Sequence, residues 1–177
     1  MMMRSNDQPR RDLFLRRLKW FAFAIIQLAL FSRAMGGDMV KHSFSFDTRI
    51  DSPDAEVLDY QYGSSGQFGT HANKEMVQRG RVFGQWNTTG VMPKGEFLYV
   101  KWRLKSSGEV YEDKVDLTTR LPADITGYRI HFVIKGPQLF VYLISPETEK
   151  RPASTPAGPL KKYGDLKQYQ IYPDEAK

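Results

Sequence analysis

Apolar and polar residues alternate through much of the chain after residue 42, and a period of two predicts strands. In residues 97–105 one face is apolar and the other basic: Leu98, Val100, Trp102 and Leu104 against Lys101, Arg103 and Lys105. A turn at 105–108 leads into residues 109–117, where Tyr111, Val115 and Leu117 alternate with charged side chains. These two runs predict an antiparallel hairpin with one face buried and the other in solvent.

A second hairpin is predicted over residues 128–144. Tyr128, Ile130, Phe132 and Ile134 form the inner face of its first strand, and Gly136-Pro137 makes the turn. The second strand, 139–144, is apolar at every position. This predicts a central strand that is covered on both faces.

Shorter β-rich runs complete the pattern at 43–46, 57–62, 82–86 and 168–172. Connecting segments separate them: turns at 51–54 and 87–90, a glycine-rich loop at 63–69, a helical turn or loop at 70–79, a loop or short helix at 118–122, and an irregular excursion with four prolines at 146–163. About eight strands and few helices predict a mostly-β fold, either an antiparallel β-sandwich or a strongly twisted sheet. We expect one β-rich domain over residues 42–177, preceded by a spacer at 35–41.

Residues 1–34 have the pattern of an export signal. Six basic residues between Arg4 and Lys19 precede an apolar stretch at 20–31, and Ser32-Arg33-Ala34 supplies a small-x-small cleavage site. The apolar stretch is short for a hydrocarbon core of about 30 Å. The segment is therefore expected to be a signal peptide or, if uncleaved, an N-terminal signal anchor that contacts the inner membrane through residues 13–31. Arg10-Arg11 also fits a twin-arginine signal, and both routes predict a periplasmic protein.

Charge and cysteine content exclude several classes of function. The net charge is +6, but residues 1–34 contribute seven Lys and Arg and two Asp, or +5, so the remainder is close to neutral. This distribution fits a membrane-inserted leader rather than a nucleic-acid-binding surface. The chain has no cysteine, which excludes disulfides, thiolate metal sites, a cysteine nucleophile and lipid attachment at a cysteine.

The sequence contains few patterns that indicate catalysis. The lipase, zinc-protease, P-loop and dinucleotide-binding motifs are missing from the sequence, and His42, His71 and His131 lie on separate predicted elements, with His131 expected on an outer sheet face. Gly63, Gly66 and Gly69 have the spacing of a weak phosphate-binding signal, but no helix is predicted to begin directly after them, and a mobile loop is the expectation. Acidic residues between 47 and 59 could form a paired-carboxylate or calcium site, but a solvated turn is the expectation. We therefore expect no enzyme activity, metal or cofactor.

Exposed aromatic residues beside arginines favour a protein-binding surface. The candidates lie in the glycine loop, on the following segments and in the proline-rich excursion: Gly66, Gln67, Phe68, Arg79, Arg81, Arg103, Arg151 and Tyr163. Each of these could instead be an ordinary surface residue. Trp102, on an apolar strand face, is expected in the core.

Three segments carry a family resemblance: 57–63 leading into the glycine loop, 92–102 continuing through Tyr111, and Gly136-Pro137 with 141–143, 158–159 and 171–173. In these the chain resembles small exported bacterial proteins, mostly lipoproteins, that act as periplasmic immunity proteins to type VI secretion phospholipase effectors. The resemblance implies a protein that binds a toxic effector, a lipase, and blocks its active site or membrane-docking surface. Its motifs are turn and core positions, so it implies no individual functional residue. The chain departs from the group in lacking the lipid-bearing cysteine.

Two other classes of function stay open. One is a non-catalytic envelope-assembly or binding module held to the inner membrane by an uncleaved leader. The other is a hydrolase whose site is assembled from scattered residues, among which His71 and His131 are the candidates to test.

Overall fold

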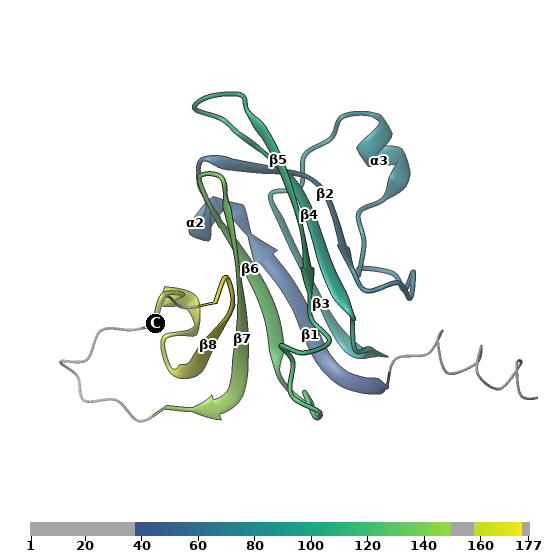
Figure 1. Cartoon of the computed structure of the whole chain (residues 1–177), viewed down its shortest axis with the longest axis vertical. Coiled ribbons are helices and arrows are strands. Elements are labelled where there is room, and N and C mark those ends of the chain that lie inside the picture. The colour runs from purple at the N-terminus through teal and green to yellow at the C-terminus, as the bar shows by residue number, and fades with distance from the viewer. Residues whose placement is uncertain (1–37, 150–157, 175–177) are drawn as a thin grey trace, which may run out of the picture. The chain divides into compact units, whose positions relative to one another are not determined.

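The computed structural model describes residues 38–149 and 158–174 (Figure 1), all of which belong to a compact unit that begins at Asp38. The predicted leader, Arg151 and the middle of the proline-rich excursion, residues 150–157, therefore lie outside the described residues. The prediction of a mostly-β fold is confirmed, with strands arranged in two sheets.

The larger sheet has five strands in the order β3-β1-β6-β7-β8. Their bounds are β1 Met39–Asp47, β3 Gln85–Pro93, β6 Arg129–Lys135, β7 Gln138–Thr148 and β8 Leu166–Tyr172. Neighbours are antiparallel except for β1 and β6, which run parallel. The expectation of a purely antiparallel arrangement is therefore wrong at this one pair, because the long chain between these strands can return β6 in the same direction as β1.

The smaller sheet has the order β2-β4-β5, with β2 at Ala55–Tyr62, β4 at Phe97–Leu104 and β5 at Val110–Asp116. The β4–β5 and β6–β7 pairs confirm both predicted hairpins, including the turn at Gly136-Pro137.

One hydrophobic core lies between the inner faces of the two sheets. Phe44 of β1 stacks on Tyr62 of β2, with ring centroids 5.1 Å apart. Trp102 of β4 is buried as expected, and its indole N–H donates to the Gly136 carbonyl at the β6–β7 turn, 3.1 Å away. Aromatic stacking and this hydrogen bond together fix one sheet against the other.

A second, smaller cluster covers the opposite face of β6 and β7, where Val133, Tyr142 and Ile144 pack beneath Leu160. The segment that covers them includes a short 3₁₀ helix, η1, at Lys161–Tyr163. β7 therefore has a buried apolar face on each side, which confirms the prediction for residues 139–144.

Three boundary predictions are wrong. The strand predicted at 82–86 is β3, at Gln85–Pro93, so the turn predicted at 87–90 lies inside a strand. β1 begins at Met39, within the predicted spacer, and β7 continues to Thr148, within the predicted excursion. At 87–90 local turn propensity is outweighed by the ladder with β1, in which Phe44 pairs with Thr88.

Two short α-helices complete the description: α2 at Thr48–Asp51 and α3 at Lys74–Gln78. Among the described residues, the helices are all too short to cross a membrane.

Candidate functional site

The connection from β2 to β3, residues 63–84, forms a projecting segment that we call the arm (Figure 1). Parts of the arm return to pair with the edge of β2: the Tyr62 amide donates to the Thr70 carbonyl (2.6 Å), and the Ala72 amide to the Tyr60 carbonyl (2.9 Å). Further on, the Phe83 amide donates to Val57 (2.8 Å). The arm thus covers the edge of β2 as an interrupted strand, and α3 bulges out where the pairing is broken.

The loop at 63–69 lies against β3. Gly69 has a φ of +86°, and a Cβ there would lie 3.0 Å from the Thr88 side chain and 3.1 Å from the Trp86 indole nitrogen, so only glycine fits. The preceding residue, Phe68, is 83 % exposed, and its ring meets Trp86 edge to face at 5.9 Å. The glycine loop is therefore held against β3 while it presents a large aromatic ring to solvent.

At the other end of the arm, Asn73 caps the N-terminus of α3, and its side chain accepts a hydrogen bond from the Met76 amide (3.1 Å). Arg79 closes the helix and contacts Glu75 at 3.7 Å across one turn, with both side chains more than 70 % exposed. Such a pair is worth roughly 0.3–0.5 kcal/mol, so Arg79 is available to a partner at little cost.

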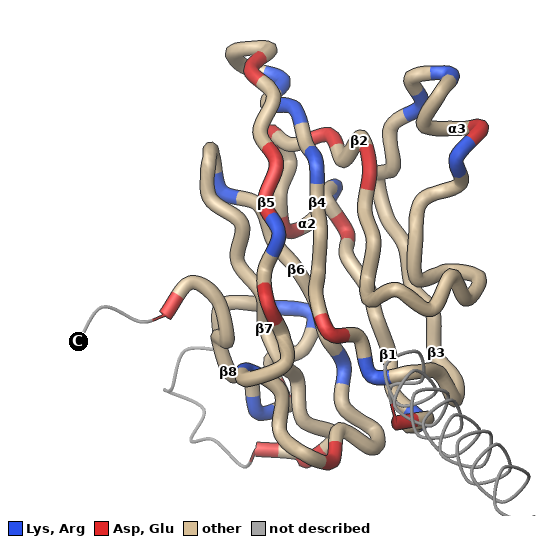
Figure 2. Tube along the Cα trace, turned by 45° about the vertical axis from the view of Figure 1, so that its right-hand side comes forward, with Lys and Arg blue, Asp and Glu red and all other residues tan. Residues whose placement is uncertain are grey.

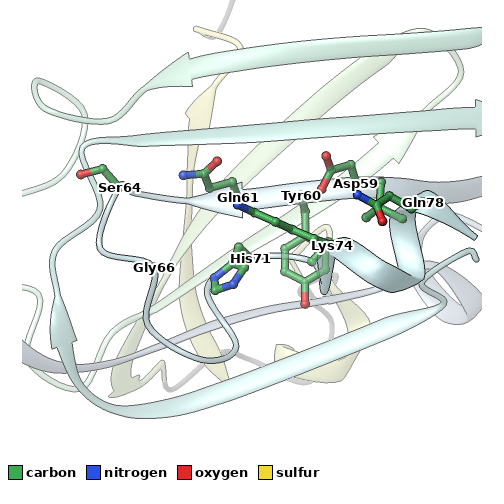
Figure 3. A pocket seen from close by; sticks show the side chains of 10 residues that line it. Asp59, Tyr60, Gln61, Ser64, Gly66, His71, Lys74 and Gln78 are labelled. Atoms are coloured by element: carbon green, nitrogen blue, oxygen red, sulfur yellow. The ribbon is translucent and has the colours of Figure 1, made fainter.

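A hollow of about 590 Å³ lies between the glycine loop and α3. Figure 3 shows its labelled side chains, with the floor formed by β2 and His71 and with Lys74 extending across it. The register of β2 against β4 shifts between Val57 and Asp59, which marks a β-bulge at this floor. Bulges re-aim side chains and recur beside functional sites.

Asp59 is the charged group most affected by the hollow. Partial burial raises its pKa above the ordinary value, although the Tyr60 backbone amide and the positive charge of Lys101 act in the opposite direction. The carboxylate is thus held where its charge is incompletely compensated, which suits a group that meets a partner's donor or cation.

Two buried side-chain nitrogens have no hydrogen-bond partner within the described part of the chain: Nδ1 of His71 and Nε1 of Trp86. His71 lines the hollow, and Trp86 lies under Gly69 and Phe68. A buried unpaired polar group costs about 1–3 kcal/mol. Both nitrogens are buried where the arm packs on the two sheets.

Five of the predicted binding residues lie on the arm, three in the glycine loop and two at and after the end of α3: Gly66, Gln67, Phe68, Arg79 and Arg81. Arg103 lies instead on β4, where its guanidinium donates twice to one oxygen of Glu56, at 3.0 and 2.6 Å. Tyr163 lies in η1 and packs edge to face on His131 at 5.4 Å. Arg151 lies outside the described residues.

The predicted set omitted three residues of this site: Asp59, His71 and Lys74. In the sequence Asp59 belongs to an acidic stretch with the pattern of a turn, and His71 is a candidate only for catalysis. No pattern in the sequence marks Lys74 as a binding residue. Trp86, which supports Phe68, was assigned only to a strand. Their proximity depends on how the arm returns to β2, and no local pattern reports that.

The acidic residues between 47 and 59 are not the solvated turn that was expected. Asp47 is 5 % exposed, and the hydrogen bond from Arg49 lowers its pKa. Asp51 Oδ2 accepts a hydrogen bond from His131 Nε2 at 3.0 Å, and the Asp51 side chain is 8 % exposed. The cluster is thus divided among separate local contacts, since Asp54 pairs with Ser106.

His131 lies on the outer face of the large sheet, as expected, but it is buried. Its Nδ1 lies 2.8 Å from the Ser45 hydroxyl, so a hydroxyl, an imidazole and a carboxylate form a chain across β1, β6 and α2. The residue types are those of a hydrolase triad. Ser45 is 3 % exposed and His131 is 1 % exposed against Tyr163, and both residues line a hollow of about 360 Å³. The hydrogen bonds of this chain also link three elements of the fold.

His42 occupies a third environment, in the core. Its Nδ1 lies 2.8 Å from the Val40 carbonyl, and its Nε2 lies 3.0 Å from the Tyr62 hydroxyl. The three histidines thus serve three separate local networks.

Comparison of the chain with protein-family models, curated proteins and solved structures finds no match in any of the three. The arm therefore carries the features that bear on function: a glycine-anchored loop and a short helix on a two-sheet scaffold, with an exposed aromatic ring, exposed arginines and two buried unpaired nitrogens.

Proposed function

We propose that this protein is a periplasmic immunity protein that binds and neutralises a type VI secretion antibacterial effector, a lipase, by covering its active site or its membrane-docking surface. The leader at residues 1–34 would deliver the β-rich domain to the compartment where such an effector acts. The proposal requires a binding surface on a rigid scaffold and no chemistry by the immunity protein.

The observation that carries the proposal is the Phe68–Trp86 pair at the arm. An aromatic ring that is 83 % exposed and supported by a second ring has the character of an interface anchor. The unpaired Trp86 nitrogen lies directly beneath it. Loops that carry recognition residues on a rigid sheet are a common solution for binding, and the two sheets with their shared core supply that rigidity here.

The hollow beside this pair gives the surface its polar component. Asp59, His71 and Lys74 line it, so it offers a carboxylate, an imidazole ring and an ammonium group to a partner. A protruding loop or side chain of an effector could enter such a hollow, while Phe68 contacts the apolar rim of the effector's cleft.

The test is co-production of the full chain with the product of the adjacent gene, sent to the periplasm. A toxic product that is neutralised in a one-to-one complex supports the proposal. Phe68→Ala should weaken that complex at least about tenfold, since loss of an anchor costs more than about 1–2 kcal/mol.

Tyr169→Ala is the matched control, because Tyr169 is also an exposed aromatic (48 %) but lies on β8. Its complex should be unchanged. An adjacent product that is neither toxic nor bound contradicts the immunity proposal, and equal effects of the two variants contradict the assignment to the arm.

A further inference from the structure

The large sheet ends at β3, and this edge is chemically unlike the other strand edges. β3 has nine residues and not one of them is charged. By contrast, β5 at the edge of the small sheet carries Glu112, Asp113, Lys114 and Asp116, which appear as alternating red and blue in Figure 2. The arm covers the edge of β2, and β8 carries Lys167. Charges and covering segments are the usual protection of an edge strand. β3 has no charged residue, and the described contacts of the glycine loop with it are those of Gln67, Phe68 and Gly69.

The backbone groups that face outward can be assigned from one contact. The Gln67 side-chain amide donates to the Val91 carbonyl at 3.4 Å, so that carbonyl points away from β1. In an antiparallel ladder, the direction of the backbone groups alternates. Gln85, Asn87 and Thr89 therefore also direct their N–H and C=O groups to the open edge.

A side-chain contact supports this assignment independently. Thr89 is paired with Ser43, and their hydroxyl oxygens lie 2.8 Å apart, as expected for a pair without backbone hydrogen bonds to each other. Moreover, the Ser43 amide donates in the other direction, to the Tyr128 carbonyl. Side chains at 87, 89 and 91 are exposed, so the outward groups are accessible.

We propose that the β3 edge binds a second copy of this chain, with the two β3 strands antiparallel across a two-fold axis so that the large sheets become continuous. Near such an axis each residue meets its own copy, and a charged residue would face a like charge. β3 avoids this, and its middle residues, Thr88 and Thr89, are β-branched and suited to cross-strand pairing. The 3.4 Å bond from Gln67 is long and is readily replaced by a ladder hydrogen bond.

Pairing at this edge has a consequence for the arm. Gln67 reaches Val91 and Phe68 contacts Trp86, so each arm flanks the edge that forms the seam. A dimer would therefore carry the two arms beside one seam. The inference is independent of the proposed function, because it depends only on β3.

The cysteine-free sequence permits a direct test. Single cysteines are placed one at a time at residues 87–91 of the full chain, and disulfide formation is followed in whole cells after mild oxidation. Only a residue close to the two-fold axis can reach its own copy, because a disulfide needs Cα atoms about 4.4–6.8 Å apart. We expect one sharp maximum within the scan, at least about tenfold above Val110→Cys, an exposed position on the charged β5 edge.

The proposal is overturned if cysteines on β3 cross-link two copies no faster than Val110→Cys does. It is also overturned if the β3 cysteines form disulfides only with other proteins. A second variant addresses the interface itself. Adding Asn87→Asp to the best cysteine variant places like charges near the axis on an exposed side chain and keeps an oxygen acceptor for Arg129, so it should abolish the cross-link without lowering the urea midpoint. An undiminished cross-link in a folded double variant also overturns the proposal.

Discussion

At the scale of single residues, the partly buried Asp59 carboxylate lowers the stability of the folded protein at neutral pH, whereas the proposed function gives the same group a role in binding the effector. Burial raises its pKa, so the charged form is disfavoured in the folded protein relative to the unfolded chain. The folded state then binds more protons than the unfolded state above about pH 3.8, and stability falls as the pH rises through this window.

Asp59→Asn should therefore raise the urea midpoint at neutral pH and reduce its fall between about pH 4 and pH 6. If the carboxylate contacts the effector, the same variant should weaken the complex. Asp113→Asn, on β5, is the control, and a variant that is both less stable and fully active would contradict this account of Asp59.

His42 gives the opposite dependence on pH. Burial lowers its pKa below 6.5, although the hydrogen bond to the Val40 carbonyl partly offsets this. As the pH falls through about 6.5 the unfolded chain takes up a proton that the folded chain takes up only at lower pH, so stability decreases on acidification.

His42→Gln should make the urea midpoint less dependent on pH between about pH 7.5 and pH 5.5, because glutamine does not titrate and can still bond to Val40 and Tyr62. The two midpoints are compared across that range in the same buffers. A variant with the same slope as the parent chain would exclude His42 as the group responsible.

At the scale of elements, the glycines of the arm differ in what surrounds them. Gly66 has a φ of +64° and open space around it, whereas Gly69 has a φ of +86° and contacts Thr88 and Trp86. Gly66→Ala should cost about 1–2 kcal/mol from the left-handed backbone alone. Gly69→Ala adds overpacking and should cost roughly 2–4 kcal/mol, while it also displaces Phe68 from Trp86.

Urea unfolding and the binding assay together separate these effects. Gly66→Ala serves as the matched control, since it changes the same backbone property without a clash. Equal losses of stability in the two variants would show that the contact of Gly69 with β3 is unimportant.

The elements that could be predicted from sequence are those whose partners are near in the chain. Both hairpins follow from alternation on each side of a short turn, and the uniformly apolar run at 139–144 indicated a strand that is covered twice. β3 was placed too early, because Asn87 to Gly90 have turn propensity and its outward face is polar but uncharged. Only pairing with β1, some 45 residues earlier in sequence, makes this segment a strand.

The candidate site also has one part that could be predicted from local sequence and another that depends on distant pairing. The loop with Phe68 was predictable, because its glycines and aromatic residue are adjacent. The hollow was not, since it requires the β-bulge before Asp59 and the return of His71 to the β2 edge. Arg103 looked available in sequence, but its pairing with Glu56 depends on strand register across 47 residues. The Ser45–His131–Asp51 chain likewise joins residues up to 86 positions apart.

At the scale of the whole molecule, the proposed function separates delivery from recognition. Delivery is assigned to residues 1–34, and recognition to the arm on the β-rich domain. If this division holds, a chain that lacks residues 1–34 should bind the effector in vitro as tightly as the full chain, because the arm and its two supporting sheets lie entirely after Asp38. The same chain should fail to protect cells against a periplasmic effector, since it stays in the wrong compartment.

Restoring export with an unrelated signal peptide is the decisive control. It should recover protection in full, while the Phe68→Ala change in the re-exported chain should reduce protection again. Survival of cells that produce only the leaderless chain would contradict periplasmic action, and loss of binding by the leaderless chain would contradict the assignment of recognition to the β-rich domain. Delivery is therefore tested by protection of cells and recognition by binding in vitro, so each half of the proposed function can be rejected without the other.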